Sequence, residues 1–391
     1  MTADPTQAQA VRKGASLCFV VSSPMTVTAF LKAHIAAATE AGYRVSVVMN
    51  TDDPATLSTL GIPATLHPVA IERRISPWRD LAAVLQLHAL FRRERFDLVH
   101  SISPKAGLLG MLAARLAGVP QRIHTFTGQV WATRTGAARR ILKSADRLLA
   151  WLTTTALVDS RSQRDFLVTE GVVAAAKAQV IGNGSICGVD TDRFAPSPAH
   201  RESVRRELGT DATATIALFL GRLNRDKGIL ELAEAYAGLA GELPALHLVL
   251  VGPDEEGLLP RVRAIAGNAA ARVHHVPWTG EPERYMAAAD IFCLPSHREG
   301  FGLVAIEAAA VGLPVLASRI YGVTDAVAEG ETGLLHPPGD IGAIATLLRR
   351  LAVDEPLRQT LGGEGRDRAL REFGQREVVA GQLAFYGKIL N

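Results

Sequence analysis

Short, largely apolar runs alternate with segments of helical spacing along almost the whole chain. The run at 17–21 is apolar throughout, and strand-like runs that carry one to three polar residues follow at 45–49, 97–102, 215–220 and 246–251. Helices are predicted between them, among others over 28–41, 77–93, 106–116 and 136–151 and from residue 161 onward. Apolar runs of this length are typical of parallel strands buried on both faces, with the intervening helices as crossovers. The chain has 391 residues, which is too long for one ordinary core. The alternation therefore predicts an α/β protein with two doubly wound domains.

The composition changes at residues 183–198, which are rich in glycine and proline and poor in apolar side chains. Such a stretch indicates an interdomain hinge. We predict an N-terminal domain over 1–190, a C-terminal domain over 196–374 and a final helix over 375–391. Asp190 and Asp192 lie in the hinge, where hinge and capping roles explain them better than a metal site does.

Residues 295–317 read PSHREGFGLVAIEAAAVGLPVLA, which predicts a loop, a helix and a strand that follow a strand at 291–294. Gly300 and Gly302 allow the backbone to approach a ligand closely. The first amides of the helix suit a phosphate group. Glu299 and Glu307 flank this position, so the pattern suggests sugar and ribose hydroxyls held around a diphosphate.

A second polar loop, at 221–228, follows the strand at 215–220 and carries Arg222 and Lys227. A guanidinium and an ammonium on one loop can clamp a diphosphate from two directions. Ion pairing with Asp226 or Glu231 is the alternative interpretation. Ligands in parallel sheets bind at the carboxyl ends of the strands, so both polar loops are predicted to face the same ligand.

In the first half, the loops at 22–26, 103–105 and 125–131 also follow strands. Lys105 precedes a helix, where it could meet an anion or be an ordinary solvated lysine. His124 ends a strand before Gly128, and a packed or capping role stands beside a catalytic one.

The net charge of +3 conceals an asymmetry between the halves. Residues 1–195 carry 22 Lys and Arg against 14 Asp and Glu, and residues 196–391 carry 20 against 25. The basic half suggests an anionic partner, either a membrane surface or a phosphorylated substrate; ordinary surface charge is the alternative. No nucleic-acid recognition motif is present, and we expect no nucleic-acid partner.

The cysteines and the hydropathy pattern indicate the cellular compartment of the protein. Cys18, Cys187 and Cys293 are scattered, which suits buried residues in a reducing cytoplasm. No apolar run approaches the length of a membrane-spanning helix, and the polar start does not look like a signal peptide. We expect a cytoplasmic protein, with peripheral attachment to the inner membrane.

Together these motifs resemble the retaining glycosyltransferases of family 4. Glu299 and Glu307 match the family's Glu-x7-Glu pattern, and G-R-L-x-x-x-K-G at 221–228 resembles its donor-diphosphate loop. The run at 183–194 is similar to its interdomain signature. HSISPKAGLLG and RIHTFTGQVW resemble the subset that builds bacterial surface polysaccharides and O-antigens. The resemblance extends from about residue 17 to the end.

The resemblance implies a GT-B fold, with two facing Rossmann-like domains, a cleft between them and a final helix that crosses back to the first domain. The implied donor-binding residues are Gly221, Arg222, Lys227, Gly252, Glu299, Gly300, Phe301, Gly302, Leu303 and Glu307. The implied catalytic residues are Glu299, Arg222, Lys227 and His124. The residues implied to bind the acceptor are Lys105, Ser23 and Thr127. The loop at 22–26 departs from the family because it lacks glycines, and Thr127 stands where relatives often carry histidine.

The implied activity is retaining transfer of a hexose or N-acetylhexosamine from a nucleotide diphosphate sugar, UDP-linked, to a polyprenyl-diphosphate-linked saccharide. This reaction belongs to surface polysaccharide or lipopolysaccharide synthesis and calls for no metal or other cofactor. The basic domain would contact the anionic inner-membrane surface. Alternatives are a nucleotide-sugar epimerase of the same architecture, a transferase with a soluble acceptor, and an inactive nucleotide-sugar-binding subunit.

Overall fold

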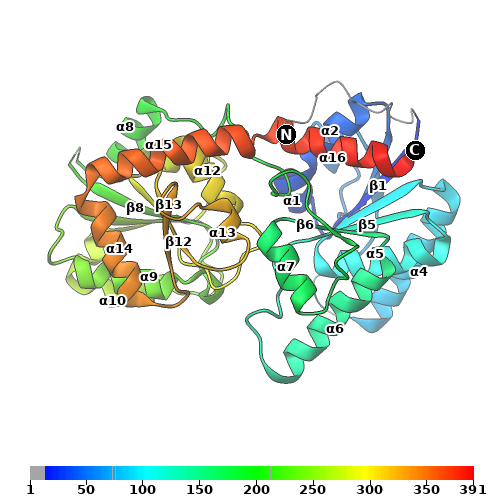
Figure 1. Cartoon of the computed structure of the whole chain (residues 1–391), viewed down its shortest axis with the longest axis horizontal. Helices are drawn as coiled ribbons and strands as arrows, with labels where there is room; N and C mark the ends of the chain where they lie inside the picture. Colours follow the sequence, from blue (N-terminus) through cyan, green and yellow to red (C-terminus); the bar gives the residue numbers. More distant parts are fainter. Residues whose placement is uncertain (1–13, 73, 75, 212) are drawn as a thin grey trace. The chain divides into compact units, whose positions relative to one another are not determined.

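The computed structural model describes residues 14–72, 74, 76–211 and 213–391, and it divides into two compact units (Figure 1). The first unit comprises 1–188 together with 375–391, and the second comprises 189–374. The division falls between Gly188 and Val189, within the stretch 183–198 that was predicted as the hinge. The polar start of the sequence lies outside the described residues.

The first unit is built on a seven-stranded parallel sheet in the order β3-β2-β1-β4-β5-β6-β7. The chain winds outward from β1 in both directions, which is the doubly wound arrangement. Its strands are β1 (Ser16–Val20), β2 (Arg44–Met49), β3 (Thr65–Pro68), β4 (Leu98–Ile102), β5 (Gln121–Phe126), β6 (Thr155–Val158) and β7 (Ala178–Gln179).

The helices of the first unit include four that match predicted segments: α4 (Pro77–Glu94), α5 (Pro104–Ala117), α6 (Gly136–Leu152) and α7 (Arg161–Thr169). The others are α1 (Pro24–Thr26), α2 (Lys32–Glu40), α3 (Thr56–Thr59) and α16 (Gln375–Leu390). The helix expected over 28–41 is interrupted, because a π-helical segment, Val27–Leu31, precedes α2.

The second unit repeats the plan with a six-stranded parallel sheet in the order β10-β9-β8-β11-β12-β13. Its strands are β8 (Thr215–Leu220), β9 (Leu246–Val251), β10 (Val273–Val276), β11 (Ile291–Leu294), β12 (Val315–Ser318) and β13 (Gly333–His336). Its α-helices are α8 (Pro198–Glu207), α9 (Ile229–Leu239), α10 (Leu259–Ala266), α11 (Pro282–Ala288), α12 (Leu303–Val311), α13 (Val323–Ala326), α14 (Ile341–Val353) and α15 (Glu355–Glu372). The predicted fold class, two doubly wound α/β domains, is confirmed.

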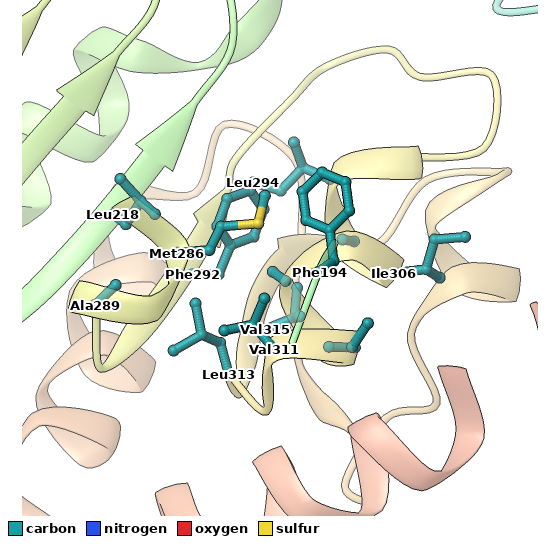
Figure 2. Close-up of a cluster of buried hydrophobic side chains, with 14 of the residues drawn as sticks. Phe194, Leu218, Met286, Ala289, Phe292, Leu294, Ile306, Val311, Leu313 and Val315 are labelled. Carbon is teal, nitrogen blue, oxygen red and sulfur yellow. The ribbon is translucent and has the colours of Figure 1, made fainter. Parts of the chain in front are cut away.

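A large apolar cluster fixes α12 in the second unit. Figure 2 shows Phe292, Leu294 and Met286 gathered with Ile306 and Val311 of that helix. Every residue of α12 except Glu307 is apolar, and most of them are buried. Tight packing of this kind leaves little freedom of movement, so the start of α12 has a defined position at the carboxyl ends of the strands.

The last helix, α16, is part of the first unit's core. The Tyr386 hydroxyl lies 2.5 Å from Nδ1 of His100 on β4, and both side chains are almost fully buried. Gln121 donates a hydrogen bond of 3.0 Å to the carbonyl of Ile389. The resemblance implied a returning helix, and in the structure α16 belongs to the first unit although the second unit precedes it in sequence.

Among the helices of the described residues, none is long and apolar enough to cross a membrane.

Candidate active site

The two polar loops singled out in the second half, 221–228 and 295–302, lie in contact within the second unit. Gly228 has a φ of +68°, and a Cβ added to it would lie 2.0 Å from the carbonyl oxygen of Pro295. The amide of His297 donates a hydrogen bond of 2.9 Å to the carbonyl of Asp226. This approach requires glycine at position 228 and holds the two loops together.

Lys227 and Glu299 meet at this contact. The ammonium of Lys227 lies 2.5 Å from Oε1 of Glu299, and Ser296 donates a hydrogen bond of 2.8 Å to the same oxygen. The two charged side chains are 20% and 13% exposed, so water screens the pair only partly. The structure therefore brings together one predicted cation and one predicted carboxylate, which lie 72 residues apart in sequence.

Arg222 stands at the other end of the same loop. It forms an ion pair of 3.1 Å with Glu255, and Asn224 donates a hydrogen bond of 3.2 Å to that carboxylate. The Arg222 side chain is 53% exposed and so remains accessible to an anion. The Oδ1 atom of Asn224 is buried and has no hydrogen-bond partner among the described residues.

The alternative partners weighed for these cations are engaged elsewhere. Asp226 pairs with Arg298 at 3.2 Å, and Glu231 lies 2.9 Å from Nε2 of His297. The two loops are thus linked by backbone and side-chain contacts at several points.

Gly221 and Gly252 directly follow two neighbouring strands, β8 and β9, at the same edge of the sheet. Gly252 has a φ of +139°, and a Cβ there would lie 2.0 Å from the carbonyl oxygen of Gly221. His275 of β10 lies with Nε2 2.9 Å from the carbonyl oxygen of Gly252. Only glycine permits this close approach of the strand ends.

The N-terminus of α12 opens beside Glu299. Gly302 precedes the helix with a φ of +85°, and Leu303 is its first residue. Gly300 is closely covered, because a Cβ on Gly322 would lie 2.3 Å from its carbonyl oxygen. The first amides of a helix have no partner within it and attract anions. Phe301 differs from its neighbours: its side chain is buried against Phe373, so from this position only the backbone can reach a donor.

Glu307 lies one turn into α12 and is half-buried. Burial raises the pKa of its carboxyl to about 7; the charge of Arg193 opposes this shift and the charge of Glu283 adds to it. None of the described residues donates a hydrogen bond to the Glu307 carboxylate. A partly desolvated acceptor without donors suits a ligand that carries hydroxyl groups.

In the first unit, His124 is only 2% exposed. Its Nδ1 lies 2.8 Å from the Ser101 hydroxyl, its ring packs edge-on against Phe126, and a Cβ on Gly107 would lie 2.5 Å from its Cε1. Burial lowers the pKa of His124 to about 3, so the imidazole is neutral at physiological pH. This is the environment of a packed histidine, and a contact between His124 and the donor sugar stays a prediction.

The three residues predicted for the acceptor side follow three different strands of the first unit, and Lys105, expected to precede a helix, lies in the first turn of α5. The ammonium of Lys105 pairs with Asp80 at 2.6 Å and also donates to the carbonyl of Arg74, so it is engaged rather than solvated. Ser23 precedes α1, and its hydroxyl lies 3.4 Å from that of Thr26. The carbonyl of Thr127 accepts a hydrogen bond of 2.8 Å from Gln163. Acceptor binding by these residues stays a prediction.

Asp190 of the Asp-x-Asp pair accepts hydrogen bonds from the amides of Asp192 and Arg193, at 3.2 Å and 3.1 Å. It therefore shapes a local turn, which is a structural role of the kind weighed above. Across the described residues, no three His, Cys, Asp or Glu side chains are grouped as a metal ion would require.

Sequence reasoning missed Ser296, Asn224 and Glu255, which hold Glu299 and Arg222 in place. Ser296 lies within the predicted 295–317 stretch and Asn224 within the 221–228 loop, so the position of each offered a signal. Glu255 offered none, because it comes from the loop after β9 and reaches Arg222 only through the fold.

The sequence matches known families over most of its length. Residues 200–368 match the glycosyl transferases group 1, and residues 27–184 match the glycosyl transferase 4-like domain. The capsular polysaccharide biosynthesis glycosyltransferase CapM of Staphylococcus aureus is 30% identical over 325 residues, which cover 83% of this chain and 85% of CapM.

Other relatives differ in the acceptor that their names give. The UDP-Gal:alpha-D-GlcNAc-diphosphoundecaprenol alpha-1,3-galactosyltransferase of Escherichia coli is 31% identical, with 73% of this chain and 74% of the relative covered. The D-inositol 3-phosphate glycosyltransferase of Streptomyces avermitilis is 35% identical, with 71% and 62% covered.

Solved structures show the same fold. Sucrose-phosphate synthase from Thermosynechococcus elongatus superposes with a TM-score of 0.78 at 24% identity, covering 96% of this chain and 99% of the other. Anabaena HepE in complex with UDP gives a TM-score of 0.75 at 20% identity, covering 93% and 97%. The chain therefore belongs to the family 4 glycosyltransferases and has the GT-B fold.

Proposed function

We propose that this glycosyltransferase moves a hexose or N-acetylhexosamine from a UDP-sugar to a lipid-linked saccharide, with retention at the anomeric carbon. The proposed donor site rests on one observation: Lys227 and Glu299 form an ion pair in the second unit, close in sequence to the N-terminus of α12. The complex of HepE with UDP supports the choice of nucleotide.

The donor's diphosphate would contact Arg222, Lys227 and the first amides of α12. Breaking the bond between the sugar and the diphosphate leaves negative charge on the leaving group. Cations and helix amides that are already in position stabilise this charge as it forms. The diphosphate would compete with Glu255 for Arg222 and with Glu299 for Lys227, so donor binding is expected to exchange these ion pairs. Because two cations meet the diphosphate, the proposal needs no metal ion.

Glu299 and Glu307 would bind different parts of the donor. Glu299, fixed by Ser296 and Lys227, would accept hydrogen bonds from sugar hydroxyls. Glu307, one turn into α12, would accept hydrogen bonds from the ribose hydroxyls. In the retaining scheme the acceptor hydroxyl attacks on the side of the leaving group, and the departing diphosphate takes its proton. No covalent bond to Glu299 is needed.

The lipid-linked acceptor is proposed from two relatives, one named for capsular polysaccharide synthesis and one for a diphosphoundecaprenol acceptor. A soluble acceptor is the second candidate, because the inositol-phosphate enzyme is 35% identical to this chain. With a lipid-linked acceptor, the protein would work at the inner-membrane surface.

A nucleotide-release screen tests the proposal. The protein is incubated with UDP-, GDP- and dTDP-sugars, each with polyprenyl-diphosphate saccharide, with inositol phosphate or with no acceptor. We expect UDP release that depends on the lipid-linked acceptor. Conversion of the UDP-sugar without any acceptor would identify an epimerase instead. The anomeric configuration of the product, read by NMR, tests retention, and unchanged turnover in EDTA tests the absence of a metal requirement.

Two variants of one loop test the diphosphate clamp. Lys227→Ala removes a proposed phosphate contact and is expected to lower the rate roughly 10²–10³-fold. Arg225→Ala is the matched control, because Arg225 lies in the same loop but is 65% exposed and turns toward Glu256 at 3.6 Å. Equal turnover by the two variants would contradict the assignment of Lys227.

A further inference from the structure

The outward face of α6 in the first unit combines apolar and basic side chains. Six exposed residues recur at helical spacing: Arg140, Ile141, Ser144, Arg147, Leu148 and Trp151. At 3.6 residues per turn they fall within an arc of about 120°. Ile141 is 69% exposed, Leu148 46% and Trp151 58%, and at this spacing they lie along one face of the helix instead of being scattered singly.

The face carries positive charge and no negative charge. The single acidic residue of α6 is Asp146, which is buried and accepts a hydrogen bond of 2.7 Å from the Trp131 indole. Arg139 and Lys143 lie on the flank of the helix and are paired with Glu170. Within the described residues no carboxylate pairs with Arg140 or Arg147, although Arg147 donates to two backbone carbonyls.

The end of α5 continues the surface. The guanidinium of Arg115 stacks over the Trp151 ring with 4.0 Å between the guanidinium carbon and the ring centroid. Its neighbour Leu116 is 60% exposed. An aromatic ring beside cations and aliphatic side chains is the combination that lies at the boundary between lipid headgroups and acyl chains.

The net charge of the first unit is also positive, as the α6 face is. The first unit carries 23 Lys and Arg against 13 Asp and Glu, a net +10, whereas the second carries 19 against 26, a net −7. Anionic lipids attract such a surface through the charges and retain it through the buried apolar area.

From these observations we infer that the α6 face, defined by Arg140, Ile141, Arg147, Leu148 and Trp151 with Arg115 and Leu116, docks on an anionic lipid bilayer. This deepens the proposed function and rests on it for the lipid-linked acceptor. Nucleic acid is a weaker match, because the exposed aliphatic side chains would remain in water on a phosphate backbone.

Vesicle binding tests the inference directly. The full-length protein is sedimented with vesicles of pure phosphatidylcholine or of an equimolar mixture of phosphatidylcholine and phosphatidylglycerol. We expect binding to the anionic vesicles at low salt and release at high salt, because the attraction is screened over a Debye length. Arg140→Gln/Arg147→Gln should lower the partition coefficient roughly 30-fold. Brominated acyl chains should quench the fluorescence of wild-type protein and should quench a Trp151→Phe variant much less.

Two controls match these changes. Arg261→Gln/Arg263→Gln removes the same charge from exposed positions of α10 in the second unit and should leave binding unchanged. Trp78→Ala removes a tryptophan that is 83% exposed on α4 and that is followed by Arg79, which is already paired with Glu72. Thermal unfolding of each variant separates loss of docking from loss of the fold.

Three results would overturn the inference: no binding of wild-type protein to anionic vesicles, equal losses in the control variants, or a dimer in sedimentation equilibrium that dissociates on Trp151→Ser. The last would show that a second copy covers the face. UDP release measured without vesicles is independent of docking. If the α6 face does not bind vesicles, the proposed donor binding is therefore unaffected. If no UDP is released, vesicle binding by the α6 face can still be measured.

Discussion

From the proposed contact between Glu307 and the ribose, we predict that donor affinity depends on pH in a range where most carboxylates do not titrate. Burial raises the pKa of this carboxyl from 4.5 to about 7. Ribose hydroxyls donate hydrogen bonds, and the ionised carboxylate accepts them best. Because protonation removes the better acceptor, affinity should be highest above pH 7 and should fall as the pH is lowered.

The size of the effect follows from the ionised fraction. With a pKa of about 7, roughly 90% of the carboxyl is ionised at pH 8 and about 3% at pH 5.5. An apparent dissociation constant scales inversely with the fraction of protein that is competent to bind, so it should rise about 30-fold. A carboxyl with the ordinary pKa of 4.5 would still be about 90% ionised at pH 5.5 and would give almost no change.

Isothermal titration calorimetry with a UDP-sugar between pH 5.5 and 8 measures this dependence. A UDP-sugar is the right probe, because its esterified diphosphate has no group that titrates in that range. Glu307→Gln should bind weakly at every pH, with a dissociation constant at least as high as that of wild-type protein at pH 5.5. Glu256→Gln removes an exposed carboxylate of the same unit and should keep the wild-type pH profile.

Two outcomes would refute the reasoning. A flat profile in wild-type protein would mean that Glu307 is ionised throughout or does not meet the nucleotide. A Glu307→Gln variant that kept the 30-fold change would assign the titration to another group.

Three further predictions concern stability and loop contacts. Burial raises the pKa of Asp159 to about 7 from 3.8, so the folded state binds its proton more tightly than the unfolded state and stability is lost as the pH rises from about 4 to 7. Asp159→Asn should therefore stabilise the first unit by about 4 kcal/mol at pH 8 and about 2 kcal/mol at pH 5 in urea unfolding; an equal gain at both values would contradict this. Gly228→Ala should push the two active-site loops apart and weaken donor binding more than tenfold in calorimetry. The new Cβ would lie 2.0 Å from the carbonyl oxygen of Pro295, and the backbone must move to relieve this contact. Gly257→Ala has a similar φ, +65°, with open space around the new Cβ, so equal effects would show that backbone strain alone is responsible. Ser296→Ala should lower turnover roughly tenfold or more through loss of a hydrogen bond to the charged Glu299, without a change in melting temperature; unchanged turnover would remove Ser296 from the site.

The regular elements were predictable where the apolar pattern was strong. Strands β8 and β9 match the predicted ranges because their residues are apolar throughout most of their length, and α4 and α6 match closely because their spacing is helical. Two strands were missed. β3 is a partly exposed edge strand reading TLHP, and β13 reads GLLH, which is too short for periodicity to show.

The types of residue in the candidate site could be predicted from the sequence, but most of the contacts between them could not. The spacing around Glu299 and the loop with Lys227 indicated a phosphate site, but the sequence offered only nearby Asp226 and Glu231 as ion-pair partners. The partners are Glu299 and Glu255 instead, since neighbouring parallel strands bring their following loops to one edge of the sheet. His124 and Lys105 could not be judged from sequence, because burial decides their chemistry and depends on the packing of α4 and α5.

The place of α16 in the first unit has a consequence for biosynthesis. Tyr386, which lies against His100, leaves the ribosome only after the whole of the second unit, 189–374. At ordinary rates of translation this delay is roughly 10 to 40 s, during which the apolar surface under α16 has no cover. The first unit therefore cannot complete its core until the second unit has been synthesised. A chain that loses 375–391 should misfold at its N-terminal end, far from the lesion in sequence.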